Sequence, residues 1–432
     1  MRLSGKLKTG CFILEGLNAL ATTFYFYYFY FFMQKQFGAG DKANLVLAAL
    51  NGLVYAIAVL WSGRFAQRAG YFTSLKIGLV IMIVALAVGK RLDSATGHVT
   101  VMVVATIGMC FTWPCLEALV SEGETPVRLQ RIIGLYNVVW AGWGALAYFI
   151  GGAMLEKLGL KSMFVVPIAI QVVQLALTVW LECEAKHFHA NPLPPPPAER
   201  GKRANAAEPF PSWKGGVGSS ARLNPRPIAR ARVFLRMAWL ANPFAYIAIN
   251  TLIAVMPGLA TRLKLSTTLA GYCFSVWCFA RLVAFFALWF WPGWHYRFRW
   301  LLVSYLALIG SFGLILLVPS LAVLVGAQLV FGVSLGLIYY SSLFYSMDVG
   351  ETKGVHGGIH EAAIGLGNFA GPAVGAAALY FLPQSPHSGA VAVGILLLCG
   401  LGGLLGIWRR TKACVGVHAS ACSRDAPQER IS

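Results

Sequence analysis

The chain has 432 residues, of which 58% are hydrophobic and only 12% are charged. A soluble domain carries roughly twice that charged fraction, so the composition excludes an ordinary soluble protein. The formal net charge of +19 would suit a nucleic-acid-binding protein. The basic residues, however, lie in loops between apolar blocks, as in the cytoplasmic loops of membrane proteins, and we expect no nucleic-acid partner.

The apolar residues form blocks of about twenty, the length with which an α-helix crosses the hydrocarbon core of a bilayer. We predict an all-α integral membrane protein whose twelve transmembrane helices cover residues 10–34, 44–62, 72–90, 100–120, 131–153, 162–182, 236–259, 267–291, 299–318, 321–346, 358–381 and 389–408. With a cytoplasmic N-terminus, the cytoplasmic loops hold most of the Lys and Arg residues, even when the long central loop is left out. We therefore expect a multi-pass protein of the cell (inner or plasma) membrane with both termini in the cytoplasm.

The composition changes once, between the sixth and seventh spans. Residues 183–235 contain the run Pro194 to Pro197 and are otherwise rich in Gly, Ala, Ser, Lys and Arg. Such a segment buries little, so we expect a disordered cytoplasmic linker. The linker separates an N-terminal six-helix bundle (1–182) from a C-terminal one (236–408), which a cytoplasmic tail (409–432) follows.

Glycines repeat between the fifth and eleventh spans at an offset of 223 residues. The matched pairs are Gly134 with Gly357, Gly142 with Gly365, Gly144 with Gly367, and Gly152 with Gly375. Transporters are often built from parallel repeats related by an axis along the membrane normal. The pattern predicts two pseudo-symmetric bundles.

The loop between the second and third spans reads Gly-Arg-Phe-Ala-Gln-Arg-Ala-Gly-Tyr-Phe over residues 63–72. It resembles the Gly-x-Leu-Ala-Asp-Arg-x-Gly-Arg-Arg signature of the major facilitator superfamily (MFS), with Gln67 at the acidic position. The resemblance implies a twelve-helix transporter in which Gly63, Gln67, Arg68 and Gly70 help to hold one end of the protein closed. The neutral Gln67 weakens the charge–dipole part of such a latch. In the fifth span, Ala147-Tyr148 replaces the Gly-Pro step of the family's antiporter motif.

Two ionisable residues inside late spans require an explanation, because such groups cost about 2.5–3.5 kcal/mol on insertion scales. Glu361, next to His360, either exchanges a proton or binds solute, or it satisfies backbone N–H groups at the start of its helix. Arg281 lies too deep to reach the interface, so it either binds an anionic solute or forms a structural pair with Glu361.

Two more carboxylates lie in early spans. Glu15 and Asn18 form a polar pair on the first helix that serves either solute binding or hydrogen bonding between helices. Glu117 lies near Arg128 and Arg131, and we expect these three residues to form a charge network at the cytoplasmic gate.

Aromatic residues are candidates for the walls of a cavity. The run Phe24 to Phe32 consists only of Phe and Tyr, and we favour packing over binding for it because so long a run must also cover lipid and neighbouring helices. Further candidates are Trp113, Trp140, Trp277, Tyr339 and Tyr340.

These features favour a secondary transporter that moves a small organic solute by alternating access between spans one, four, seven and ten, coupled to protons. Efflux of amphiphilic compounds is an alternative. A membrane-embedded enzyme that uses His360 and Glu361 as an acid–base pair is another. The spacing of His356 and His360 does not favour a metal, and no phosphate-binding loop is present in the sequence. We expect a monomer without a cofactor, with solute, protons and lipid as its partners.

Overall fold

The computed structural model describes residues 5–121, 126–190, 225–349 and 353–424. Within these ranges only the backbone is described at 126–130, 188–190, 225–229, 347–349, 353–360 and 412–424. Helices make up nearly all of the described chain, which contains no strand. In lipid the backbone polar groups must be satisfied within the protein, and a helix does this inside each segment.

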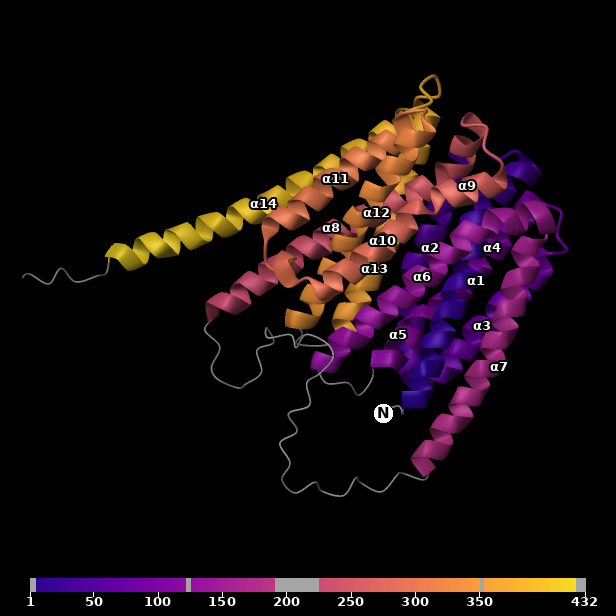
Figure 1. Ribbon diagram of the computed structural model, residues 1–432, viewed down its shortest axis with the longest axis horizontal. Coiled ribbons are helices and arrows are strands. Elements are labelled where there is room, and N and C mark those ends of the chain that lie inside the picture. Colours follow the sequence, from indigo (N-terminus) through magenta and orange to yellow (C-terminus); the bar gives the residue numbers. More distant parts are fainter. Residues whose placement is uncertain (1–4, 122–125, 191–224, 350–352, 425–432) are drawn as a thin grey trace, which may run out of the picture.

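The helices form two groups that follow the sequence (Figure 1). The N-terminal half comprises α1 (Gly5–Phe37), α2 (Asp41–Ala69), α3 (Tyr71–Gly89), α4 (Ala95–Cys110), α5 (Trp113–Ser121), α6 (Pro126–Leu158) and α7 (Ser162–Ala190). The C-terminal half comprises α8 (Pro225–Arg262), α9 (Thr267–Phe274), α10 (Val276–Phe290), the 3-10 helix η1 (Pro292–Trp294), α11 (Phe298–Leu317), α12 (Leu321–Val349), α13 (Lys353–Phe381) and α14 (Ser388–Arg424). Because α4 with α5 and α9 with α10 each form one interrupted span, the prediction of twelve spans is confirmed.

Eleven of these spans are long and apolar enough to cross a membrane. The twelfth is α1, whose 33 residues include Glu15, Asn18 and four tyrosines that lower its mean hydropathy. The helices extend beyond several predicted limits: α7 continues to Ala190 and α8 begins at Pro225, so both enter the segment expected to be a linker. Residues 191–224 lie outside the described part of the chain.

The interruption between α4 and α5 has a chemical cause at Pro114. Proline has no N–H, so it cannot satisfy the carbonyl group four residues earlier, that of Cys110. The hydroxyl of Ser62 on α2 donates a hydrogen bond to this carbonyl at 2.8 Å. A side chain of a neighbouring helix therefore replaces the missing backbone bond.

The repeated glycines occupy equivalent places in the two halves. A Cβ atom added at Gly144 on α6 would lie 3.2 Å from Oγ1 of Thr23 on α1. One added at Gly367 on α13 would lie 2.8 Å from Cβ of Tyr246 on α8. Thr23 and Tyr246 are related by the same offset as the glycines, so both glycines allow the first helix of their own half to pack closely. This equivalence supports the predicted internal repeat.

The most extensive contacts between the two halves are those of α2 with α13 and of α6 with α9 and α10, and α8 also packs against α1 and α2. At the first interface a Cβ on Gly365 would lie 2.7 Å from Cα of Ala56. At the second, a Cβ on Gly142 would lie 3.7 Å from Leu282. Glycine is therefore required sterically at the α2–α13 interface, whereas the equivalent place on α6 has room for a methyl group.

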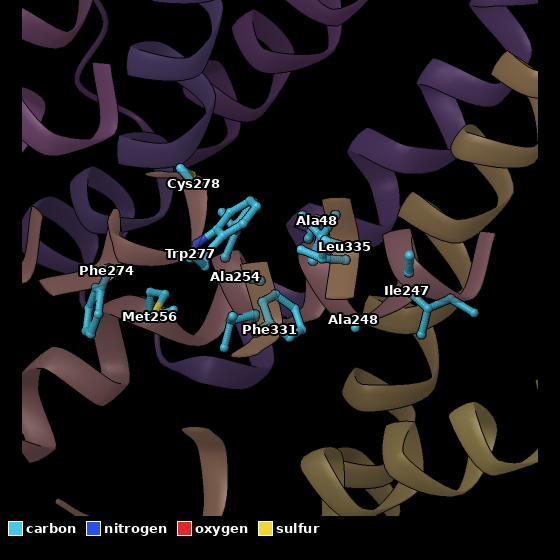
Figure 2. Close-up of a cluster of buried hydrophobic side chains, with 14 of the residues drawn as sticks. Ala48, Ile247, Ala248, Ala254, Met256, Phe274, Trp277, Cys278, Phe331 and Leu335 are labelled. Atoms are coloured by element: carbon cyan, nitrogen blue, oxygen red, sulfur yellow. The ribbon is translucent and has the colours of Figure 1, made fainter. Parts of the chain in front are cut away.

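Aromatic and aliphatic side chains fill the interior of both halves. Tyr28, in the middle of the aromatic run of α1, is fully buried and donates a hydrogen bond of 2.5 Å to the carbonyl oxygen of Tyr148 on α6. In the other half, Trp277 of α10 packs against Phe331 of α12 in the cluster of Figure 2. Most of the aromatic run is buried, as the packing interpretation predicts.

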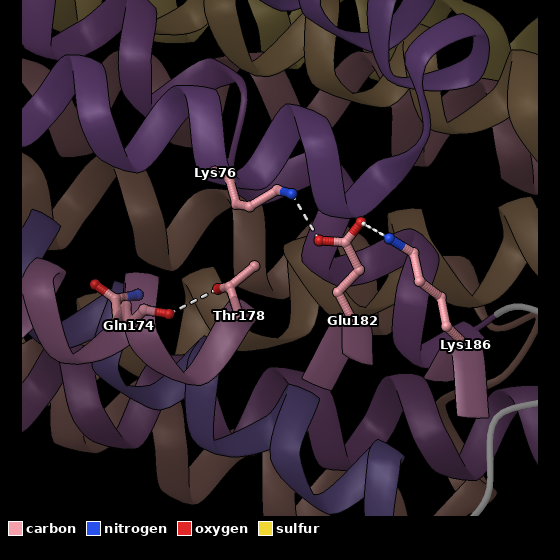
Figure 3. A network of polar contacts seen from close by, with 5 residues as sticks. All are labelled: Lys76, Gln174, Thr178, Glu182 and Lys186. Atoms are coloured by element: carbon pink, nitrogen blue, oxygen red, sulfur yellow. Dashed lines mark hydrogen bonds and ion pairs between the residues drawn. The ribbon is translucent and has the colours of Figure 1, made fainter. Parts of the chain in front are cut away.

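An ion-pair network joins α3 to α7 inside the N-terminal half (Figure 3). The carboxylate of Glu182 lies 2.6 Å from Nζ of Lys76 and 3.0 Å from Nζ of Lys186. The network ties two helices of the N-terminal half together.

We call the end of the molecule where α1 begins the proximal end and the end where α1 finishes the distal end. The halves are joined at the distal end by polar side chains. Asp41 at the start of α2 forms an ion pair of 2.8 Å with Arg262 at the end of α8. Glu156 of α6 accepts a hydrogen bond of 2.8 Å from the backbone N–H of Thr268 on α9. These contacts hold the distal end closed.

Candidate functional site

A cavity of about 200 Å³ lies between the two halves. Its walls come from α1, α2, α4, α5 and α6 of one half and from α8, α10, α12 and α13 of the other. The N-terminal half contributes Thr22, Thr23, Phe26, Tyr27, Asn51, Tyr55, Met109, Trp113, Glu117, Tyr136 and Trp140. The C-terminal half contributes Tyr246, Ile249, Asn250, Ile253, Arg281, Tyr339, Glu361, Ile364 and Asn368.

Glu361 projects into this cavity from α13. Its Oε2 atom accepts a hydrogen bond of 2.5 Å from the hydroxyl of Tyr55 on α2. The bond joins the two halves. Because α13 begins at Lys353, Glu361 lies about two turns inside the helix and not at its N-terminus. In this structure the Glu361 carboxylate therefore accepts a hydrogen bond from Tyr55 and does not cap the start of α13.

Arg281 on α10 is 5% exposed and also lines the cavity. Its guanidinium carbon lies 4.5 Å from the ring centre of Trp140 and 4.9 Å from that of Trp277. Trp140 belongs to the opposite half, so one of these cation–π contacts crosses the interface. Within the described residues Arg281 forms no ion pair with Glu361, and its Nε atom has no hydrogen-bond acceptor.

Amide side chains complete the polar part of the wall. Asn250 of α8 donates a hydrogen bond to Oδ1 of Asn368 on α13. On α2, which packs against α13, Asn51 accepts a hydrogen bond from Thr106 of α4. These pairs fix the amide groups in place while leaving them in contact with the cavity.

Glu15 and Asn18 do not form part of the cavity wall. Both are fully buried, and in the described part of the chain neither oxygen of Glu15 has a hydrogen-bond partner of normal geometry. The phenol of Tyr136, which does line the cavity, lies beside Glu15. Glu15 is thus one side chain removed from the cavity.

The aromatic candidates divide into wall and interior. Trp113, Trp140 and Tyr339 line the cavity. Trp277 is fully buried and contacts two residues of the cavity wall, Arg281 and Tyr27. Tyr340 packs instead against Phe285 and Trp294. Within the aromatic run of α1, Phe26 and Tyr27 face the cavity although we had expected packing.

The residues expected at the gate lie in different places. Glu117 lines the cavity on α5, after the break at Pro114. Gly70, with a φ of +90°, forms the one-residue link between α2 and α3.

Of the other gate candidates, Gly63 lies in the last turns of α2, and Gln67, Arg68 and Arg131 are exposed. The side chains of Arg128 and of the site candidate His360 lie outside the described residues. The predicted charge network at the gate is therefore not tested.

Several wall residues escaped the sequence analysis. Tyr55, Tyr136 and Tyr246 were missed because a tyrosine in an apolar span carries no charge and does not stand out as the ionisable residues do. Asn51 and Tyr55, like Tyr246 and Asn250, are four residues apart and so lie on one helical face. That spacing was the available signal.

No set of three His, Cys, Asp or Glu side chains with the geometry of a metal site occurs among the described residues.

Two related helical halves around a cavity with polar and aromatic walls define a helical membrane transporter. The chain belongs to the major facilitator superfamily, whose sequence model matches residues 11–372. The comparison with curated proteins returned no match.

Solved structures share the fold. The nucleoside transporter NupG is 13% identical, with a TM-score of 0.64 over 93% of this chain and 99% of that one. A point mutant of NupG is 15% identical, with a TM-score of 0.63 over 94% and 99%. The human organic anion transporter MFSD10 (TETRAN) is 17% identical, with a TM-score of 0.60 over 94% and 100%. At this level of identity the likeness extends to the fold alone.

Proposed function

We propose that the protein is a secondary active transporter that carries a small organic solute by alternating access. The observation that carries this proposal is the cavity itself, to which both halves contribute side chains. A site divided between two rigid halves becomes accessible from either side when one half rocks against the other. The distal contacts of Asp41 and Glu156 then belong to the state that is closed at the distal end.

Protons drive the cycle in this proposal, and Glu361 carries them. Its hydrogen bond to Tyr55 joins α13 to α2, the helices of one interface between the halves. A charged carboxylate accepts a stronger hydrogen bond than a neutral one. Gain or loss of a proton at Glu361 therefore changes the strength of a contact that must adjust when the halves rock.

The solute is small and contains a planar ring. The cavity volume of about 200 Å³ is below the roughly 300–1,000 Å³ of pockets for drug-sized ligands. Trp113, Trp140 and Tyr27 offer ring faces or edges, and the amides offer hydrogen bonds. The structural neighbours are transporters of nucleosides and of organic anions, and both kinds of solute are small organic molecules.

We further propose that the protein acts as a monomer in the cell membrane, with the proximal end in the cytoplasm. The excess of Lys and Arg in the proximal loops supports this orientation. Efflux of amphiphilic compounds is the competing direction of transport, for which the aromatic wall is the supporting feature.

The test is flux of radiolabelled nucleosides and aromatic acids into proteoliposomes, with and without an imposed proton gradient. We expect one class to accumulate only with the gradient. The Glu361→Gln variant should still exchange solute but should not accumulate it. The exposed Glu184 provides the matched control, because Glu184→Gln removes a carboxylate of α7 outside the cavity. Absence of flux for every solute, or accumulation by Glu361→Gln at the wild-type level, would refute the proposal.

A further inference from the structure

We infer that the transported solute carries a carboxylate, which binds to Arg281 and enters the cavity together with a proton. This inference rests on the proposed transport function and specifies its substrate class.

The first step is the burial of a charge without a partner. Arginine remains protonated at all relevant pH values and presents five N–H donors. Arg281 is 5% exposed, yet no acidic side chain in the described part of the chain pairs with it. Burying an unpaired charge is strongly unfavourable, so such a side chain requires a partner that arrives from elsewhere.

The second step is the role of the two indoles. Trp140 and Trp277 hold the guanidinium group through its π-face contacts at 4.5 and 4.9 Å. Cation–π contacts offset part of the cost of burial but use none of the N–H donors, which lie at the edge of the group. Trp140 is itself oriented by a hydrogen bond of 2.9 Å from its Nε1 to Oδ1 of Asn137. The indoles therefore orient the guanidinium group and leave its donor edge for a ligand.

The third step is the position of this edge. Arg281 belongs to the cavity wall. Its Nε atom is buried without an acceptor, so the two Nη groups are the donors that can meet a ligand in the cavity. The hydroxyl groups of Tyr27 and Tyr246, which also line the cavity, lie within electrostatic range of the guanidinium group. Planar bidentate recognition by arginine suits a carboxylate or a phosphate.

The cavity carboxylates explain why a proton accompanies the anion. The titratable groups around the cavity on the other helices are Glu117, Glu361, Tyr27, Tyr55, Tyr136, Tyr246 and Tyr339. If Glu117 and Glu361 are ionised, they repel an anion through a medium of low dielectric constant. Protonation of either one removes its share of that repulsion. Anion binding must therefore strengthen as the pH falls, which is the thermodynamic condition for symport.

Ligand-induced thermal stabilisation of the purified full-length protein tests the anion class without requiring transport. The probes are matched pairs that differ in one charge: benzoate and benzamide, nicotinate and nicotinamide, indole-3-acetate and indole-3-acetamide. Adenosine represents neutral nucleosides. We expect at least one carboxylate to raise the Tm while its amide does not, and the shift to grow from mildly alkaline to mildly acidic pH.

Variants then locate the site. Arg281→Gln should weaken binding of the active carboxylate at least about tenfold, as expected for the loss of hydrogen bonds from a charged donor. Arg281→Lys should retain part of the affinity, because lysine keeps the positive charge but lacks the paired N–H donors that bind both oxygens of a carboxylate. Glu361→Gln should reduce the pH dependence of binding, whereas Glu184→Gln should behave as wild type.

Three results would overturn the inference: stabilisation by amides or adenosine equal to that by the carboxylates, no stabilisation by any carboxylate, or wild-type binding by Arg281→Gln. If Arg281→Gln does not fold, the carboxylate–amide comparison on the wild-type protein still decides. Binding of a carboxylate without flux in proteoliposomes would refute the transport proposal and leave the anion site standing. Flux of a neutral solute without binding of any carboxylate would refute the anion site and leave the transport proposal standing.

Discussion

The carboxylate of Asp41 on α2 and the guanidinium group of Arg262 on α8 lie 2.8 Å apart and join the two halves at the distal end. Asp41 also rests against Gly258 one turn before Arg262, where any side chain would collide with its carboxylate. The first turn of α2 is thus fitted to the last turns of α8 by both charge and shape.

Removal of this ion pair should shift the equilibrium away from distal closure. The Arg262 side chain is 47% exposed, so the pair contributes only about 0.5–1 kcal/mol, a roughly two- to fivefold change in population. Spin-label distances across the distal ends of α2 and α8 would detect the shift in Arg262→Gln. Lys186→Gln is the control, because its ion pair with Glu182 lies within one helix of one half. Equal distance distributions in Arg262→Gln and the wild type would contradict the prediction.

Gly365→Ala should be more harmful than the repeat-related Gly142→Ala. A methyl group at Gly365 meets the backbone of Ala56 at 2.7 Å, whereas one at Gly142 remains 3.7 Å from Leu282. Overpacking of this kind costs about 1–3 kcal/mol. We expect a lower Tm for Gly365→Ala and a Tm near or above the wild-type value for Gly142→Ala, since alanine favours helix. Similar Tm values for the two variants would show that the α2–α13 interface adjusts.

The spans, the repeat and two of the charged wall residues are predictable from the sequence because they depend on local composition. Contacts between the halves could not be predicted from local composition, because the residues that form them are distant in the sequence. Tyr55 and Glu361, for example, are 306 positions apart. Glu117 was assigned to the gate because it lies close in sequence to Arg128 and Arg131, whereas its side chain lines the cavity. Glu15 is on the same helical face as Thr22, seven residues later, yet it is fully buried beside Tyr136. Such packing is set by tertiary structure and not by helical phase.

Tyr55→Phe should weaken coupling to protons while preserving the fold. The change removes the hydroxyl group that donates to Glu361 at 2.5 Å and keeps the ring. A hydrogen bond to a charged group contributes about 1.5–3 kcal/mol. Solute accumulation per unit of proton gradient in proteoliposomes should fall by about tenfold or more, with exchange less affected. The exposed Tyr380 serves as control in Tyr380→Phe. Unchanged accumulation in Tyr55→Phe would show that the hydrogen bond between Tyr55 and Glu361 is not needed for coupling to protons.

Ser62→Ala should destabilise the protein through the carbonyl group of Cys110. That carbonyl accepts the Ser62 hydroxyl at 2.8 Å because Pro114 cannot donate to it. A buried acceptor left without a partner costs about 1–3 kcal/mol. The Tm should fall in Ser62→Ala, and adding Pro114→Ala should restore part of the loss by supplying the missing backbone N–H. Additive effects in this double-mutant cycle would show that the two residues do not act on the same carbonyl.

His295, in the proximal loop between α10 and α11, should make the protein less stable in acid. Burial lowers the pKa of its imidazole from 6.5 to about 4, and the neutral ring stacks on Phe344 with the ring centres 4.2 Å apart. Between these two pKa values the unfolded chain binds a proton that the folded protein does not. Stability is therefore constant above about pH 6.5 and is lost as the pH falls towards 4.

The expected loss is about 1–2 kcal/mol, because the ring is only partly buried and solvent reduces the full effect of the pKa difference. His295→Phe keeps the stacking surface and cannot take up a proton. Its Tm should fall less steeply with acidification than that of the wild type, whereas His387→Phe, in the distal loop after α13, should leave the slope unchanged. Parallel Tm profiles for His295→Phe and the wild type would mean that the folded protein accommodates the charged imidazole at no cost.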